Sequence, residues 1–262
     1  MGTGLDIYGY GVDYYGYRKK FGVLVPSTNT TVEVEYNAMR PEGVITATRP
    51  CVIPPFVVTN EEEFVGMVKA ISEATEPGLR DLLTVKPDHV VFGYSAETFW
   101  DGKQRSDAMF KRYDDIAQEI AGCGITFGAQ ALADAFALYP GVKKIGVISP
   151  YAPIGNEMVE KFLNDIGYEV ARKEGHNSPG PVEIAHESFA KSRELVKLVD
   201  GDDVDMILQA GTNLAFAPLA DALEKELGKP VLAINTITWW HALRTNGIPD
   251  RMDGFGSLMR EH

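Results

Sequence analysis

The hexapeptide Phe21-Gly-Val-Leu-Val-Pro26 recurs as Ile145-Gly-Val-Ile-Ser-Pro150, 124 residues further along the chain. A second pair of segments, Asp88-His-Val-Val-Phe-Gly-Tyr-Ser95 and Asp205-Met-Ile-Leu-Gln-Ala-Gly-Thr212, is separated by 117 residues. Two related segments at nearly the same offset indicate two similar halves. In each copy a short apolar run, typical of a buried parallel strand, ends in small or hydroxyl-bearing residues. Because ligands of open parallel sheets bind beyond the carboxyl ends of the strands, these ends are where we expect a functional site.

Around these segments, strand patterns alternate with helix patterns of ten or more residues, an order typical of βαβ units and parallel sheets. Asn60 and Glu63 match a capping box that opens one helix, and Pro77-Gly78 is expected to interrupt or kink that helix. The predicted strands are 21–25, 88–93, 125–127, 144–148, 168–172, 205–209 and 230–234. We therefore predict an α/β fold of two pseudo-twofold-related lobes, each with a parallel sheet flanked by helices, and an active-site cleft between them.

The predicted lobes comprise residues 21–138 together with 247–262, and residues 139–246. Residues 1–20 are a separate arm rich in Tyr and Gly. We expect this arm to pack on its own subunit or on a neighbouring one, with an aromatic lid over a site as the alternative. The arm favours a homo-oligomer.

Composition excludes several classes of function. The formal net charge of −12, with acidic residues scattered along the chain, argues against nucleic acid or an anionic membrane as a partner. Membrane-span and signal-peptide patterns are not found in the sequence. The two cysteines, Cys51 and Cys123, are too few for a disulfide framework and match no zinc-ligand spacing. We expect a cytoplasmic protein without a metal or organic cofactor.

The turn after the first predicted strand offers polar groups at the start of a helix. Ser27, Thr28 and Asn29 supply hydroxyl and amide groups, and the helix dipole favours an anion there. Glycine-rich phosphate motifs are not found, so a small carboxylate is the better candidate ligand. The alternative is that Ser27 and Asn29 only cap the helix.

The two repeat-related strand ends form the second half of the predicted site. Tyr94 and Ser95 follow one strand, and Ala210, Gly211, Thr212 and Asn213 follow the other. Facing each other across a cleft, these groups could bind a carboxylate or stabilise an enolate-like charge. Thr212 and Asn213 could instead simply cap the next helix. For proton transfer the candidates are Tyr151, Glu97 and His186, each of which could also be merely structural or solvated.

The chain resembles the aspartate/glutamate racemase superfamily, in particular its maleate cis-trans isomerase and arylmalonate decarboxylase branch. The segments that carry this resemblance are Phe21-Gly-Val-Leu-Val-Pro-Ser-Thr-Asn-Thr-Thr-Val-Glu33, Ile145-Gly-Val-Ile-Ser-Pro-Tyr151 and Thr212-Asn213-Leu214. The resemblance implies a cofactor-free site between two α/β lobes, a small carboxylate substrate bound by Ser27, Thr28 and Asn29, and a substrate-contacting Tyr151.

This chain departs from that family at its cysteines. The resemblance implies one Cys at each central strand end in racemases and maleate isomerases, and only the second in decarboxylases. Here the first end reads Gly93-Tyr-Ser-Ala96, and the second family Cys falls on Ala210 or Gly211. Ser95 could replace a thiol only with a neighbouring base, because an unactivated hydroxyl is far less acidic than a thiol.

The sequence therefore predicts a cofactor-independent enzyme that acts on a small carboxylate or diacid without a catalytic Cys. An isomerase or decarboxylase type of reaction is favoured, with chemistry next to the carboxylate. A hydrolase or lyase on the same scaffold, and a non-catalytic carboxylate-binding protein, are the alternatives.

Overall fold

The computed structural model describes residues 12–262 and contains two four-stranded parallel sheets in that range. The first sheet has the order β2-β1-β3-β4 and the second the order β6-β5-β7-β8, so corresponding strands occupy corresponding places. The strands of the first sheet are β1 (Lys19–Pro26), β2 (Val44–Cys51), β3 (His89–Phe92) and β4 (Gly124–Thr126); those of the second are β5 (Lys144–Ser149), β6 (Glu169–Gly175), β7 (Met206–Gln209) and β8 (Val231–Ala233). The predicted two-lobed α/β architecture is confirmed.

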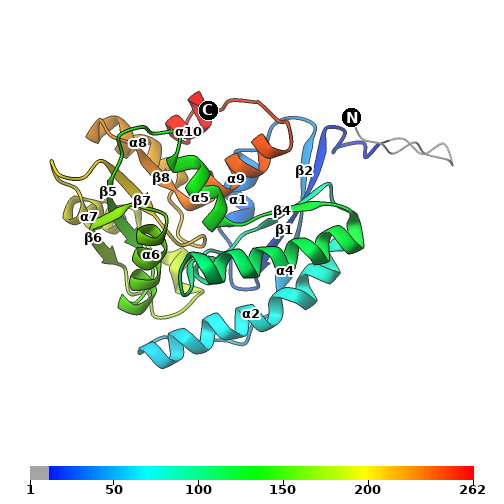
Figure 1. Ribbon diagram of the computed structural model, residues 1–262, viewed down its shortest axis with the longest axis horizontal. Coiled ribbons are helices and arrows are strands. Elements are labelled where there is room, and N and C mark those ends of the chain that lie inside the picture. The colour runs from blue at the N-terminus through cyan, green and yellow to red at the C-terminus, as the bar shows by residue number, and fades with distance from the viewer. Residues whose placement is uncertain (1–11) are drawn as a thin grey trace.

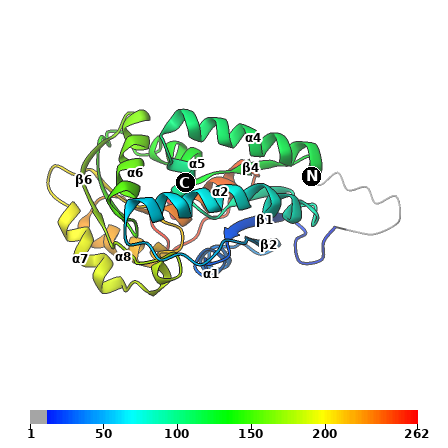
Figure 2. The ribbon, with the colours of Figure 1, turned by 90° about the horizontal axis from the view of Figure 1, so that it is seen from below.

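Helices cover both sheets (Figures 1 and 2). In the first half they are α1 (Val32–Ala38), α2 (Glu61–Leu83), α3 (Ala96–Phe99), α4 (Lys103–Ala121) and α5 (Gly128–Phe136). In the second half they are α6 (Pro153–Asp165), the 3-10 helix η1 (Glu183–His186), α7 (Phe189–Val199), α8 (Ala217–Leu227), α9 (Ile234–Thr245) and α10 (Ser257–Glu261). Figure 1 shows α2 and α4 along one face of the first sheet, with α1 and α9 on the other.

The repeated hexapeptides are the central strands of the two sheets, β1 and β5. Their shared glycines allow a helix to approach closely. A Cβ on Gly22 would lie 3.1 Å from the Leu82 side chain of α2, and one on Gly146 would lie 2.7 Å from the Val199 carbonyl oxygen of α7. The glycine that the two copies share therefore meets the same packing requirement in both lobes, the close approach of a helix to the central strand.

Two local expectations differ from the structure. Strand β2, which pairs with β1, was not predicted because its sequence, Val-Ile-Thr-Ala-Thr-Arg-Pro-Cys, is polar and contains Pro50. Such a strand is tolerated at a sheet edge, where one side of the backbone needs no partner. Helix α2 runs through Pro77 without the interruption that was one of the two predicted outcomes, and a kink at Pro77-Gly78 stays a prediction. Asn60 caps the helix as predicted, since its Oδ1 accepts from Glu63 N (3.0 Å), but the Glu63 carboxylate reaches back to Thr59 N (2.7 Å), one residue before the cap, and not to the N–H of Asn60.

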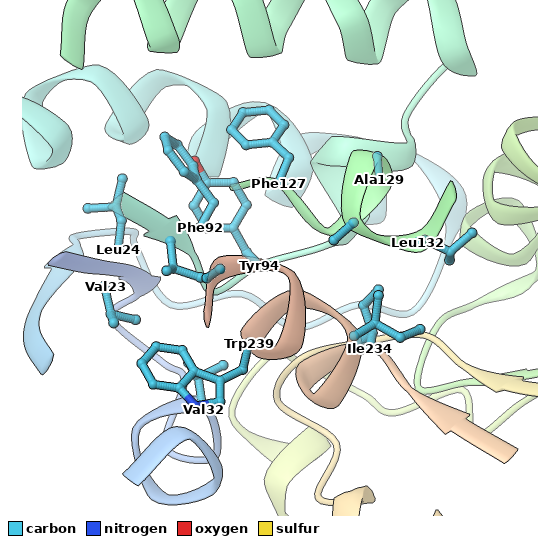
Figure 3. Close-up of a cluster of buried hydrophobic side chains, with 14 of the residues drawn as sticks. Val23, Leu24, Val32, Phe92, Tyr94, Phe127, Ala129, Leu132, Ile234 and Trp239 are labelled. Carbon is cyan, nitrogen blue, oxygen red and sulfur yellow. The ribbon is translucent and has the colours of Figure 1, made fainter. Parts of the chain in front are cut away.

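The two lobes share one large hydrophobic core that contains side chains from both sheets. The helices that follow the last strand of each sheet, α5 and α9, pack against each other between the lobes (Figure 1). On α9, Trp239 stacks on Tyr36 with ring centroids 4.8 Å apart, and its indole Nε1 donates to the Met39 carbonyl (2.9 Å). Figure 3 shows Trp239 and Ile234 of α9 between Val32 on one side and Leu132 on the other. This core fixes the lobes relative to each other.

The predicted arm lies mostly outside the described residues, and Tyr8 and Tyr10 are among those not described. Its described tyrosines, Tyr14, Tyr15 and Tyr17, are exposed. Strand β1 begins at Lys19, inside the segment predicted as arm. The lobe boundaries at residues 138 and 246 and the role of the arm stay predictions.

Candidate active site

The carboxyl ends of β1, β3, β5 and β7 meet around one small cavity of about 50 Å³ between the lobes. Its lining residues are Pro26, Thr28, Asn29, Met67, Ile71, Tyr94, Ser95, Ala96, Glu97, Tyr151, Pro181, Ile184, Gly211, Thr212 and Asn213. Nine of the twelve residues proposed from the sequence are in this list. The structure thus brings together residues from four strand ends that are far apart in the chain.

The amide of Asn213 bonds to the turn after β1 in the other lobe and to Pro181 in its own lobe. Its Nδ2 donates to the carbonyl oxygens of Thr28 (3.2 Å) and Pro181 (2.8 Å). Its Oδ1 accepts from the backbone N–H of Thr30 (2.9 Å). A primary amide has two N–H donors, so the Asn213 side chain has no donor left for a ligand in this arrangement.

Thr212 and Asn29 form a second connection between the lobes. The Thr212 hydroxyl donates to the Gly93 carbonyl (3.0 Å) and accepts from Asn29 Nδ2 (3.2 Å). Asn29 Oδ1 accepts from the N–H groups of Thr31 and Val32, both at 3.0 Å, and so also caps α1. One N–H of the Asn29 amide remains for a ligand.

A pair of hydroxyls spans the cavity from one lobe to the other. Ser95 Oγ lies 2.9 Å from Tyr151 Oη, and both side chains are buried. Phe64 of α2 packs edge-to-face on the Tyr151 ring, with centroids 5.7 Å apart, and fixes its orientation. Burial raises the pKa of Tyr151 above its usual value, so this phenol is a hydrogen-bond donor rather than a base at neutral pH.

Glu97, in the first turn of α3, is the most unusual residue at the cavity. It is only 3 % exposed, and neither carboxyl oxygen has a hydrogen-bond partner in another residue of the described range. Burial raises its pKa to about 8, partly opposed by its own backbone N–H and by the positive charge of Arg105. Its negative charge, when present, also raises the pKa of Tyr151 and of Tyr94. Buried, unpaired carboxyls are uncommon, because the cost of removing the group from water is not offset.

Tyr94 has a supporting role in the wall of the cavity. The Thr75 hydroxyl donates to the Ile71 carbonyl (2.8 Å), so the Tyr94 hydroxyl, 2.9 Å from Thr75 Oγ1, must be the donor in their shared bond. Burial raises the pKa of Tyr94 well above its usual value. Tyr94 therefore connects the end of β3 to α2 as a neutral phenol.

Three residues proposed from the sequence do not line the cavity. Ser27 is exposed, and its Oγ accepts from the N–H of Ile53 (3.2 Å). Ala210 is fully buried and extends the pairing of β7 through its N–H to the Ile148 carbonyl (2.9 Å). His186 ends η1 with an exposed side chain. The geometry gives no contact between His186 and the other proposed proton-transfer residues.

The comparisons with known proteins point to one group of enzymes. No family model matches the chain. The maleate isomerase of Geobacillus stearothermophilus is 25% identical over 250 residues, covering 92% of this chain and 96% of that protein. Among solved structures, the maleate cis-trans isomerase of Nocardia farcinica bound to TRIS superposes with a TM-score of 0.84 at 18% identity, over 93% of this chain and 98% of that one. A variant of arylmalonate decarboxylase in its liganded form gives a TM-score of 0.75 at 19% identity, over 93% and 100% of the two chains.

These relatives are all enzymes, and the maleate isomerases share the two-lobed fold described above. The similarity extends over almost the whole chain.

Neither cysteine of the chain lines the cavity. Cys51, at the end of β2, and Cys123 are free and buried, with 1 % and 4 % exposure. Burial raises the pKa of Cys51 to about 12 and that of Cys123 to about 11. Both are therefore thiols rather than nucleophilic thiolates at neutral pH. Within residues 12–262 we find no group of three or more His, Cys, Asp or Glu side chains arranged to hold a metal ion, and no helix long and apolar enough to span a membrane.

Sequence reasoning missed the apolar wall of the cavity. Met67 and Ile71 of α2 supply much of it, and Ile184 of η1 adds to it. The four-residue spacing of Met67, Ile71 and Thr75 places all three on one face of α2, a signal that the sequence does contain. That spacing indicates an inward face, but it does not tell whether the face meets packed core or an open site.

Proposed function

We propose that this chain is an enzyme that acts on a small carboxylate by proton transfer at the carbon next to the carboxylate, as an isomerase or decarboxylase that uses neither a catalytic Cys nor an organic cofactor. The observation that carries the proposal is the buried, unpaired Glu97 at the cavity. The similarity to maleate isomerases and arylmalonate decarboxylase supports the class of reaction.

Glu97 has the properties that a proton-transfer group requires. With a pKa of about 8, about nine-tenths of its carboxyl groups are protonated at pH 7. A neutral carboxyl does not repel a bound carboxylate, and it can donate a proton to a carbon on which negative charge develops. The general acid or base most effective at neutral pH has a pKa close to the operating pH, and burial brings Glu97 to that range.

The hydroxyl groups around the cavity would stabilise the charge that develops. Thr28 and the pair formed by Ser95 and Tyr151 offer O–H donors to the carboxylate oxygens. In a reaction next to a carboxylate, negative charge accumulates on those oxygens as the carbon loses CO₂ or a proton. Fixed donors in a cavity of low dielectric stabilise that charge more than water does.

The missing thiols are compatible with this reaction because Glu97 replaces them as the group that moves the proton. One solved relative, a variant of the Nocardia farcinica maleate cis-trans isomerase, carries a covalently bound succinylcysteine intermediate. Since Cys51 and Cys123 are buried outside the cavity, we propose that no such covalent intermediate forms on this chain.

Steady-state kinetics with a panel of small carboxylates, including maleates, malonates and their monocarboxylic analogues, tests the proposal. Glu97→Gln should lower kcat by at least about 100-fold, the usual contribution of a general acid or base. Glu63→Gln, which changes a half-buried glutamate at the start of α2 that does not line the cavity, is the matched control and should keep full activity. Unchanged turnover by Glu97→Gln would refute the role of this residue.

The pH profile of kcat then identifies the direction of proton transfer. If Glu97 donates the proton, as after decarboxylation, kcat should be constant at low pH and fall as the pH rises through about 8. If Glu97 removes a proton, as in an isomerisation, kcat should rise through the same range. Thermal stabilisation by a carboxylate without any turnover would instead favour a binding protein.

A further inference from the structure

The position of the Glu97 carboxyl depends on the short segment that carries it, and this inference rests on the proposed function of that residue. Glu97 lies in α3, which has only four residues. A helix this short does not hold its conformation by itself. The Glu97 carboxyl has no hydrogen-bond partner in another described residue. Its position is therefore set by the contacts that hold α3 and the turn that follows it.

Helix α6 of the second lobe supplies some of these contacts. Phe99 of α3 is fully buried and packs on Phe162 of α6, with ring centroids 5.2 Å apart. Helix α6 begins at Pro153, shortly after Tyr151 of the cavity. The same helix therefore follows Tyr151 at its start and contacts the segment that carries Glu97 in its last turns.

Lys161 of α6 binds the turn after α3. Its Nζ donates to the carbonyl oxygen of Asp101 (3.0 Å) and forms an ion pair with the Asp101 carboxylate. Asp101 has φ +62°, in the left-handed region that is unfavourable for most residues with a Cβ. Because Lys161 bonds both the backbone and the side chain of Asp101, it stabilises this conformation of the turn.

Asp165, the last residue of α6, binds the start of α4, which lies beside α6 (Figure 1). Its Oδ2 accepts from the backbone N–H of Lys103 (2.9 Å) in the first turn of α4. The N-cap residue of α4, Gly102, has no side chain that could do this. A carboxylate of the other lobe therefore takes the place of an N-cap side chain, where the helix dipole also favours it.

These two side chains can affect the site more than they affect the stability of the fold. Lys161 and Asp165 are exposed, and ion pairs between exposed side chains contribute little to stability. They do, however, hold the turn that ends α3. If that turn moves, water reaches Glu97 and its carboxyl shifts, and a shift of about 1 Å can lower a reaction rate about 100-fold.

We propose that Lys161 and Asp165 are positioning residues of the second lobe, which hold residues 101–103 so that the Glu97 carboxyl stays buried at the cavity. Neither residue lines the cavity, so both act through α3 and Glu97.

Urea denaturation tests the proposal without a substrate. Burial raises the pKa of Glu97 to about 8, so Glu97→Gln should become more stable than its parent as the pH rises from 4.5 to 9. In the double variant Lys161→Met/Asp165→Ala, hydration of Glu97 should lower this pKa. Each unit by which the pKa falls reduces the advantage of Glu97→Gln about tenfold in the unfolding equilibrium constant, and we expect a reduction of at least about tenfold.

A matched control makes the same two substitutions elsewhere. Lys111 and Asp115 form an exposed ion pair within α4, and Lys111→Met/Asp115→Ala should leave the advantage of Glu97→Gln unchanged. Asp165→Asn keeps an oxygen that can accept from Lys103 N and should retain more of the advantage than Asp165→Ala. A full advantage in Lys161→Met/Asp165→Ala, or an equal reduction in the control, would overturn the proposal.

Steady-state kinetics adds a second measurement, with the carboxylate of the panel described above that the wild type turns over fastest. Lys161→Met/Asp165→Ala should lower kcat at least about tenfold, with a much smaller change in KM. The midpoint of the pH profile of kcat should also move below about 8, because Glu97 becomes hydrated. A lower kcat with an unchanged midpoint would show a merely structural effect and would overturn the proposal.

Failure of this inference is distinguishable from failure of the proposed function. If Lys161→Met/Asp165→Ala reduces the advantage of Glu97→Gln but no carboxylate is turned over, the positioning role stands and the enzyme assignment is wrong. If turnover depends on Glu97 but the double variant matches the wild type in both measurements, the enzyme assignment stands and the positioning role is wrong.

Discussion

The replacement of Glu97 by Gln should stabilise this protein at neutral and alkaline pH, although it should abolish the proposed reaction. In the unfolded chain Glu97 has its ordinary pKa of 4.5, and in the folded chain burial raises its pKa to about 8. Between these two values the folded state holds a proton that the unfolded state has released. The free energy of unfolding of the wild type therefore falls as the pH rises from 4.5 to 8 and is constant beyond that range.

The magnitude follows from the same two values. Each pH unit in this range costs the wild type about 1.4 kcal/mol, because one proton is taken up on folding. From pH 4.5 to the folded-state pKa of about 8, the accumulated cost is on the order of 5 kcal/mol. Glutamine has nearly the same shape and does not ionise, so Glu97→Gln should escape this cost.

Urea denaturation of both proteins at pH values from 4.5 to 9 measures the effect. The difference in unfolding free energy, variant minus wild type, should grow through this range by several kcal/mol and then become constant. Glu63→Gln is a control of opposite sign, because the hydrogen bonds from Thr59 hold the pKa of Glu63 below its usual value, and its removal should cost stability as the pH rises from acidic values. A difference between Glu97→Gln and wild type that is independent of pH would refute the raised pKa.

Three further substitutions have definite expected outcomes. Tyr151→Phe removes the partner of the buried Ser95 hydroxyl, so urea denaturation should show a loss of about 1–2 kcal/mol, with a larger proportional loss in kcat. Gly211→Ala should destabilise the protein by roughly 2–4 kcal/mol in the same assay, because Gly211 has φ +107° and a Cβ there would lie 2.3 Å from Pro150 Cδ. Glu35→Gln should cost about 1–3 kcal/mol, because the carboxylate accepts two N–H groups at the start of α8, and an unchanged denaturation midpoint would contradict that role.

Much of the fold could be predicted from the sequence because the same physical requirement occurs twice. Gly22 and Gly146 lie at equivalent positions of the two central strands, and each allows a helix to pack closely on the sheet. The buried runs that follow these glycines need to be apolar on both faces, which makes them easy to recognise. Strand β2 has one edge unpaired and carries Arg49 and Pro50, so its pattern does not differ from that of a loop.

The presence of a cavity at the strand ends could also be predicted, but the hydrogen bonds of each lining side chain could not. Thr212 and Asn213 were expected to contact the substrate, and their predicted place at the cavity agrees with the structure. The alternative, that Thr212 and Asn213 only cap a helix, does not hold. The Thr212 hydroxyl donates to the Gly93 carbonyl, and the Asn213 amide donates to the carbonyls of Thr28 and Pro181. Such connections join segments more than 30 residues apart, and no local pattern contains them.

Two buried glutamates show where the limit of sequence reasoning lies. Glu35 and Glu97 both occur in short helices that follow a central strand, and nothing in their flanking residues separates them. In the structure Glu35 accepts from the N–H groups of Phe216 and Ala217, both at 3.0 Å, and from Asn235 Nδ2 at 2.6 Å. Glu97 is equally buried and accepts from no other described residue. Hydrogen bonds offset part of the burial of Glu35, whose pKa burial still raises above its usual value, and they connect α1 to the start of α8 and to α9. The free-energy cost of burying the Glu97 carboxyl is not offset by hydrogen bonds from other described residues. A bound ligand that forms hydrogen bonds with this carboxyl, or exchanges a proton with it, would therefore stabilise it more than it would a carboxyl that is already paired.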